Sequence, residues 1–149
     1  MGRRAASALL LGLIPHVVGA DDTPRCAALT ALVEQETTES VAPDEIADLA
    51  KRLNAETCGT ALTQTGEHEI HCRWSFDYRA DTAVRHHERL AARIRHCLDA
   101  IQVAPEQGVN HPDSFDQSFY RAGTFSLSLS LKDKASLKKS FVFLRVGGE

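Results

Sequence analysis

The chain has 149 residues, of which 43% are hydrophobic and 25% are charged, and its formal net charge is −3 at pH 7. This length suits one domain with a single hydrophobic core and excludes two independent cores. The acidic balance argues against general nucleic-acid binding, which depends on an excess of positive charge facing the phosphate backbone.

The first 20 residues have the composition of a secretory signal peptide. Arg3 and Arg4 supply a charged start, residues 9–14 form an apolar run, and Ala20 ends a small-residue cleavage site. The run is much shorter than the roughly 20 residues of a membrane-spanning helix. Cleavage after Ala20 removes two arginines and no acid, so the charge changes from −3 to −5. We therefore expect a periplasmic or extracellular protein without a transmembrane anchor, with one mature domain over residues 21–149.

Two helices are expected within residues 21–60. Thr23 and Pro24 have the pattern of an N-cap followed by proline in the first turn, and apolar residues then recur at helical spacing. The second helix begins at Pro43, followed by two acids that complement the helix dipole, and is expected to end at Gly59. Both helices are short and amphipathic, so we expect them to pack as an antiparallel hairpin.

Residues 61–149 are expected to form a β-α-β-β-β core. Strict alternation of apolar and polar residues over 67–79 predicts a half-buried strand. An apolar stripe at helical spacing predicts a long helix that Asp81 caps. After a loop of about a dozen residues, turn signals separate three more strands near 115–121, 124–131 and 139–146. The predicted fold class is therefore α+β, an N-terminal helical hairpin followed by an antiparallel sheet packed on one long helix.

Four cysteines in a chain with an export signal predict two disulfides, for which three pairings exist. Cys26 near the start of the first helix and Cys58 at the end of the second meet at the open end of the expected hairpin. Cys72 and Cys97 lie at similar distances from the turn that joins the long strand to the long helix. We therefore expect Cys26–Cys58 and Cys72–Cys97, with Cys58–Cys72 as the main competitor because it closes the shortest loop. A redox-active pair is not expected, because the chain has no C-x-x-C motif.

Seven histidines raise the question of a metal site. His68 and His71 fall on opposite faces of the expected strand, so one ion does not easily reach both. His87 lies on the inner stripe of the long helix, near Phe76 in the expected packing, and is interpreted as a core histidine. The neighbouring His86 and the later His96 are expected to be exposed to solvent. The sequence predicts no metal site and no cofactor.

No catalytic residues are predicted. Ser114 lies close to His111 and Asp113, but nothing around it resembles a nucleophile elbow such as G-x-S-x-G, and turn chemistry explains the segment. The leading hypothesis is therefore that the protein is a binding module and not an enzyme. The alternative is a small envelope hydrolase that uses His111 and Asp113, and a third interpretation is a purely structural subunit.

Charge patterning predicts three contact surfaces. The outer face of the long helix is basic and is the leading candidate for binding a partner, although a solvated face or pairing with the acidic helical hairpin also explains it. A lysine-rich turn and a polar sheet face are the other two. In this order, their residues are Arg85, His86, Arg89, Arg93 and His96; Lys132, Lys134, Lys138 and Lys139; and His71, Arg73, Ser75, Ser126, Ser128 and Ser130.

These patterns together predict an exported, disulfide-stapled binding module. Its partner is expected to be a protein or an anionic envelope component, and its role that of an inhibitor, an immunity-type factor or an accessory subunit.

Overall fold

The computed structural model describes residues 23–36, 41–63, 66–109 and 113–148. The helices are α1 (Thr23–Glu36), α2 (Pro43–Leu53) and α3 (Asp81–Leu98), with a short 3-10 helix η1 (Ala135–Leu137). The strands are β1 (Thr57–Leu62), β2 (His68–Asp77), β3 (Ile101–Val109), β4 (Phe115–Ala122), β5 (Phe125–Lys134) and β6 (Lys139–Gly148). The expected signal peptide and its cleavage site lie outside the described residues.

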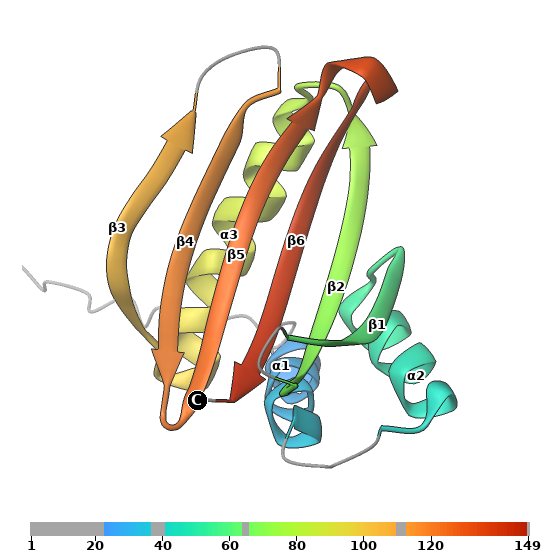
Figure 1. Cartoon of the computed structure of the whole chain (residues 1–149), viewed down its shortest axis with the longest axis vertical. Helices are drawn as coiled ribbons and strands as arrows, with labels where there is room; N and C mark the ends of the chain where they lie inside the picture. Colours follow the sequence, from blue (N-terminus) through green and yellow to red (C-terminus); the bar gives the residue numbers. More distant parts are fainter. Residues whose placement is uncertain (1–22, 37–40, 64–65, 110–112, 149) are drawn as a thin grey trace, which may run out of the picture.

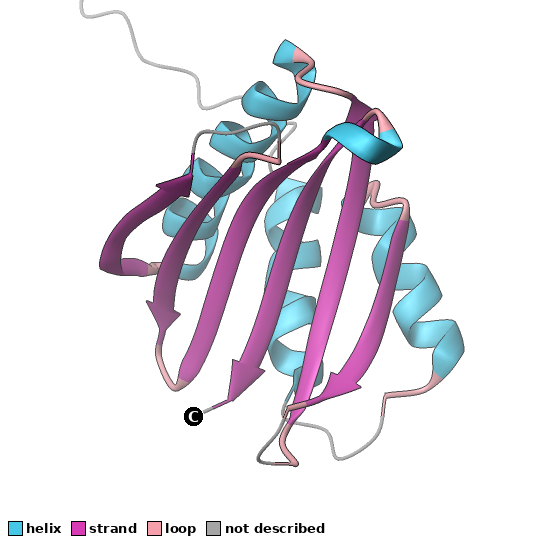
Figure 2. Ribbon diagram, turned by 45° about the horizontal axis from the view of Figure 1, so that its top comes forward, coloured by secondary structure: helices cyan, strands magenta, loops and turns pink. Residues whose placement is uncertain are grey.

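The described strands form one antiparallel sheet in the order β1-β2-β6-β5-β4-β3. Figures 1 and 2 show α1 and α3 on one face of this curved sheet, with α2 beside α1 and close to β1. Because β6 lies between β2 and β5, the end of the chain occupies the centre of the sheet. The predicted α+β class is confirmed: two N-terminal helices precede an antiparallel sheet that packs on one long helix.

The core lies between the helices and the sheet face that they cover. Alternation along β5 and β6 directs Leu129 and Leu144 to this face, and both are completely buried. Burying each such side chain stabilises the fold by about 1.5–3 kcal/mol. The large core side chains are Leu29, Leu32, Val33, Ile46, Leu49, Ile70, Trp74, Leu90, Ile94, Tyr120, Leu127, Leu129, Leu131, Val142, Leu144 and Val146.

Two strands, β1 and β3, were not predicted from the sequence, and both lie at the edges of the sheet. The sequence of β1 contains Gly59 and Ala61, which have weak strand propensity, and its pattern of exposure does not alternate strictly. The segment expected to be a loop after the long helix forms β3, which contains Pro105 and Gly108 and pairs with β4 through two register shifts. Proline and glycine are tolerated in strands mainly at edges and bulges, and this is where they occur here.

Two predicted helix boundaries are wrong. Helix α2 ends at Leu53 rather than at Gly59, because Asn54 adopts a left-handed conformation with φ 53° and its backbone N–H donates to the Lys51 carbonyl. The N-cap of α3 is Ala80, and Asp81 is the first helical residue, where its charge still complements the helix dipole.

The predicted disulfide pairing is also wrong. The bridges are Cys26–Cys97, with Cα atoms 5.1 Å apart, and Cys58–Cys72, with Cα atoms 4.1 Å apart. Because α2 ends early, Cys58 lies in β1, directly opposite Cys72 in β2. Cys97 in the last turn of α3 therefore pairs with Cys26 in the first turn of α1.

Two disulfides indicate that the protein folds and works in an oxidising, extracytoplasmic environment. In the part of the chain that the structure describes, no helix combines the length and the apolar composition needed to cross a bilayer.

Candidate functional site

The face of the sheet turned away from α1 and α3 is called here the open face. Figure 2 shows the helices on the opposite side of the strands. Strand register places Phe143 between Ser130 and Arg73, and places Phe141 between Lys132 and Ser75. The side chains of the open face are His71, Arg73, Ser75, Phe115, Gln117, Phe119, Arg121, Ser126, Ser128, Ser130, Lys132, Phe141, Phe143 and Arg145.

Four phenylalanines lie on the open face, two on β4 and two on β6, on either side of β5. The side chains of Phe115, Phe119, Phe141 and Phe143 are all half-buried, and the last two have ring centres 5.9 Å apart. The Lys132 ammonium lies 4.9 Å from the centre of the Phe115 ring and 5.4 Å from that of Phe143. These distances are typical of cation–π contacts, so Lys132 bridges the Phe115 ring on β4 and the Phe143 ring on β6.

Positive charge exceeds negative charge on this surface. Burial lowers the pKa of Lys132, and the nearby charges of Arg145 and Lys134 lower it further. Arg73 pairs with Glu56 at 3.2 Å and lies over the Phe141 ring, while Arg145 lies 3.8 Å from Glu69. Among the described residues, Arg73 and Arg145 each face one carboxylate, whereas Lys132 forms no ion pair and contacts the phenylalanine rings.

Glu56 lies at the edge of the open face and is held as a carboxylate. The Ser75 hydroxyl donates a hydrogen bond to it, and this bond, followed by the charge of Arg73, lowers the pKa of Glu56. These contacts fix Ser75 and Arg73 in place. Lys132 and Arg145 lie closer to the centre of the sheet than Arg73 does.

The predicted basic face of the long helix divides into two parts. Arg85, Arg89 and His96 are exposed, as expected. Arg93 is half-buried, and His86 packs on β2, with its ring centre 5.0 Å from that of Trp74 and 5.4 Å from that of Phe76. Both side chains line a small groove that also contains Arg25, Leu29, Leu53, Trp74 and Leu90.

The expectation that His86 is exposed is therefore wrong. Successive helical residues are separated by 100°, so the position next to the buried His87 turns toward the strand at the margin of the core. Burial lowers the pKa of His86 to about 4, and the charges of Arg89, Arg93 and His87 act in the same direction. His86 is thus a neutral packing residue at physiological pH.

This environment predicts an acid-sensitive fold. His86 has an ordinary pKa of 6.5 and a folded pKa of about 4, so the unfolded chain binds the proton first as the pH falls. Stability is therefore lost progressively from about pH 6.5 and the loss is complete below about pH 4. The ring is only partly buried, so solvent screening reduces the effect. In thermal melts at pH 7.5, 5.5 and 4.5, we expect His86→Phe to lose less stability with falling pH than wild type.

The exposed His96 provides the matched control for this measurement. His96→Phe changes the same residue type on the same helix and should retain the pH dependence of the wild type. If His86→Phe and wild type lose stability in parallel, the ring of His86 is protonated in the folded protein and its assigned environment is wrong.

The other predicted residues occupy separate places. His87 is buried, as predicted, but it faces Ser118 and Tyr120 in a cavity beside β4 rather than Phe76. Lys134 pairs with Asp113, and Lys139 pairs with Asp77, each at 3.1 Å. Strand β5 continues through the expected turn to Lys134, and η1 makes the reversal.

The residues of the alternative hydrolase do not form a described site. Asp113 accepts hydrogen bonds from the Ala135 backbone and from Lys134, and Ser114 donates to Asp133 at 2.5 Å. These bonds serve the connection between β5 and β6. His111 lies outside the described residues, so the structure does not test its predicted role in a hydrolase. Among the described residues, no three His, Cys, Asp or Glu side chains gather as metal ligands.

The phenylalanines of the open face are the functional candidates that the sequence did not single out. The sequence does contain a signal: Phe141 and Phe143 share one face of β6, and Phe115 and Phe119 share one face of β4. Strand β6 is apolar on both faces, a pattern that suits a central strand or one covered by helices; β6 is central, and α1 and α3 cover one of its faces. No protein-family model matches the sequence, and the search of curated proteins found no match.

Proposed function

We propose that the protein is an exported binding module whose open face recognises an acidic protein surface. The observation that carries this proposal is the uncovered sheet face itself, which joins four half-buried phenylalanines to an excess of cations. Protein interfaces combine a buried core, in which aromatic residues and arginine are enriched, with a polar rim. Aromatic side chains at such a centre contribute most of the binding energy.

Charge favours an acidic partner over a second copy of the chain. Lys132 and Arg145 lie close enough for the charge of Arg145 to lower the pKa of Lys132. Two open faces placed together would double this local repulsion, whereas acidic side chains would relieve it. The outer face of α3 is a weaker candidate, because two of its five predicted residues, His86 and Arg93, line the groove that borders α1.

Export is part of the proposal, and it predicts a defined mature chain. The oxidising environment that the disulfides indicate agrees with removal of a signal peptide after Ala20. Intact-mass measurement of protein recovered from the periplasm or medium should therefore give a chain that begins at Asp21. A mature chain that begins elsewhere would contradict the proposed cleavage site, and protein that retains residues 1–20 would contradict cleavage altogether.

Paired charge reversals test the binding surface. The immobilised mature protein is used to capture proteins from the extracytoplasmic fraction, and the captured partner is identified by mass spectrometry and purified. Calorimetry then compares wild type with Lys132→Glu/Arg145→Glu on the open face and Arg85→Glu/Arg89→Glu on α3. We expect the open-face pair to weaken binding by about tenfold or more, with a larger loss at low salt.

The α3 pair carries the same change in charge and is the matched control, expected to stay within about twofold of wild type. Melting curves establish that both variants are folded. A larger loss in the α3 variant would move the interface to the surface predicted from sequence. Equal affinities at low and moderate salt would contradict an acidic partner.

A further inference from the structure

A second site lies on the other side of the sheet, in a cavity of about 390 Å³ between α3 and strands β4 and β5. The cavity exists because small or polar side chains occupy facing positions. Ala91 on the helix is short, and β4 presents Asp116 and Ser118 where its next helix-facing residue, Tyr120, is large. The lining residues are Val84, His87, Glu88, Ala91, Arg95, Gln102, Asp116, Ser118, Tyr120 and Leu131.

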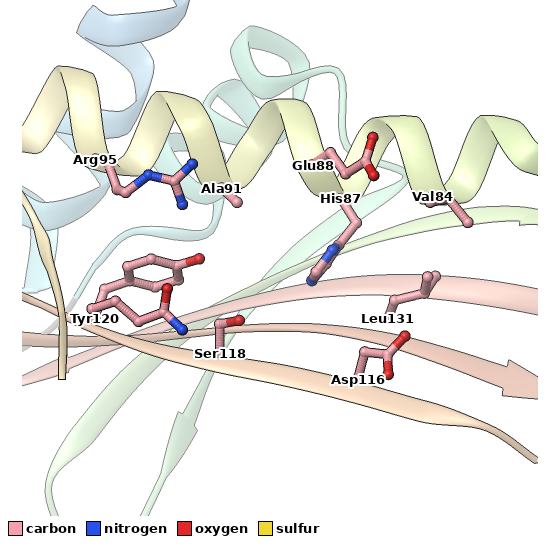
Figure 3. Close-up of a pocket in the computed structure, with 10 residues that line it drawn as sticks. Val84, His87, Glu88, Ala91, Arg95, Asp116, Ser118, Tyr120 and Leu131 are labelled. Carbon is pink, nitrogen blue, oxygen red and sulfur yellow. The ribbon is translucent and has the colours of Figure 1, made fainter. Parts of the chain in front are cut away.

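The floor of the cavity is polar and buried. His87, Ser118 and Tyr120 are 8%, 4% and 2% exposed, and Figure 3 shows His87 pointing from α3 toward Ser118. Burying polar groups beside a cavity is costly unless they are hydrogen-bonded, and the hydroxyl, imidazole and phenol groups provide both donors and acceptors. A floor of this kind suits amide groups better than an apolar ligand.

The two ends of the cavity carry opposite charges. Figure 3 shows Arg95 beside Tyr120 at one end, and Glu88 and Asp116 toward the other. Glu88 and Arg95 are seven residues apart on one face of α3, which separates them by about 10 Å along the helix axis. No ion pair with another described residue involves Glu88, Arg95 or Asp116.

Asp116 has room for its carboxylate because β3 places a glycine next to it. Gly108 is the register partner of Asp116, and a Cβ at Gly108 would lie 2.9 Å from the Asp116 carboxylate. A larger residue at this position would force the Asp116 carboxylate to shift.

We propose that this cavity binds a short peptide as a zwitterion, with its amine near Glu88 and Asp116 and its carboxylate near Arg95. An extended chain covers about 3.3–3.6 Å per residue, so a peptide of about three residues matches the separation of the charges. The volume lies in the range of small-molecule sites. The polar floor then faces the central amide groups of the peptide.

Triglycine and trialanine are the probes that test the site. Binding to the mature protein is followed by NMR chemical shifts of α3 and β4, together with the N-acetyl and C-terminal amide forms of each peptide. We expect the zwitterion to bind about tenfold more tightly than either blocked form, because each block removes one charge. Free glycine, which is too short to reach both ends, should cause no shift.

Matched variants identify the side chain that binds each end of the peptide. In Arg95→Gln, a tripeptide and its amide should bind equally, whereas the N-acetyl form should still bind more weakly. In Asp116→Asn the preference for the free amine should shrink instead. Arg89→Gln, on the outer face of the same helix, should behave as wild type.

No shift with either tripeptide at roughly 10 mM would overturn the proposal, since such a site would be weaker than millimolar affinity. Unchanged discrimination in both Arg95→Gln and Asp116→Asn would overturn it as well. The open face lies on the opposite side of the sheet, so neither result bears on the proposed protein partner.

Discussion

Replacing Cys26 and Cys97 with alanine is expected to lower the free energy of unfolding by about 4 kcal/mol, the larger effect of the two disulfide deletions. The bridge joins residues 71 positions apart and ties α1 to the end of α3. The Cys58–Cys72 bridge spans 14 positions, so the chain-entropy model gives it about 3 kcal/mol. Denaturant unfolding of the two double-alanine variants measures both values.

Peptide mapping under non-reducing conditions is the companion measurement. It should yield one peptide that contains Cys26 joined to Cys97 and another that contains Cys58 joined to Cys72. A Cys26–Cys58 peptide would contradict the placement of β1. A greater loss of stability in the Cys58/Cys72 variant would show that strand pairing at the sheet edge, rather than the docking of α1, depends on a disulfide.

Replacing Asp133 with alanine is expected to cost about 3 kcal/mol. Its carboxylate is buried, accepts hydrogen bonds from the hydroxyls of Ser114 and Ser140, and lies 3.4 Å from the Arg79 guanidinium. The Ser140 hydroxyl is completely buried and also accepts the Arg79 backbone N–H. Without the carboxylate, buried polar groups lose their partner, and that loss rather than the ion pair dominates the cost.

Asp77 provides the control, because it also pairs with a cation but its side chain is 92% exposed. Asp77→Ala should change the free energy of unfolding by no more than about 0.5 kcal/mol. Denaturant unfolding of the two aspartate variants makes the comparison. Similar costs for both would mean that the Asp133 network is solvated and does not join β4, β5 and β6.

The elements with strong local patterns could be predicted from the sequence. Strand β2 alternates without interruption from Ile70 to Phe76, and β5 alternates leucine with serine, so both strands and their buried faces follow from period-two spacing. The edge strands β1 and β3 lack such patterns and become strands only by pairing with β2 and β4. The disulfide prediction is wrong because β1 was not predicted. Only the pairing of β1 with β2 places Cys58 opposite Cys72.

The candidate site was predictable only in part. Arg73 and Ser130 belong to a sheet face that the sequence identifies as polar, and both lie on the open face. Which face of β6 the helices cover is decided by tertiary packing, so the exposure of Phe141 and Phe143 could not be predicted locally. The same holds for His86, whose neighbours Trp74 and Phe76 come from a different element.

Chemical-shift mapping with the purified partner tests the proposed interface most directly. Isotope-labelled mature protein is titrated with the protein that it captures, and backbone and phenylalanine ring signals are followed. We expect the largest changes on β4, β5 and β6, at Lys132, Phe141 and Phe143 and their neighbours on the open face. Changes confined to Arg85, Arg89 and His96 on α3, with the phenylalanine signals unmoved, would contradict the proposed interface.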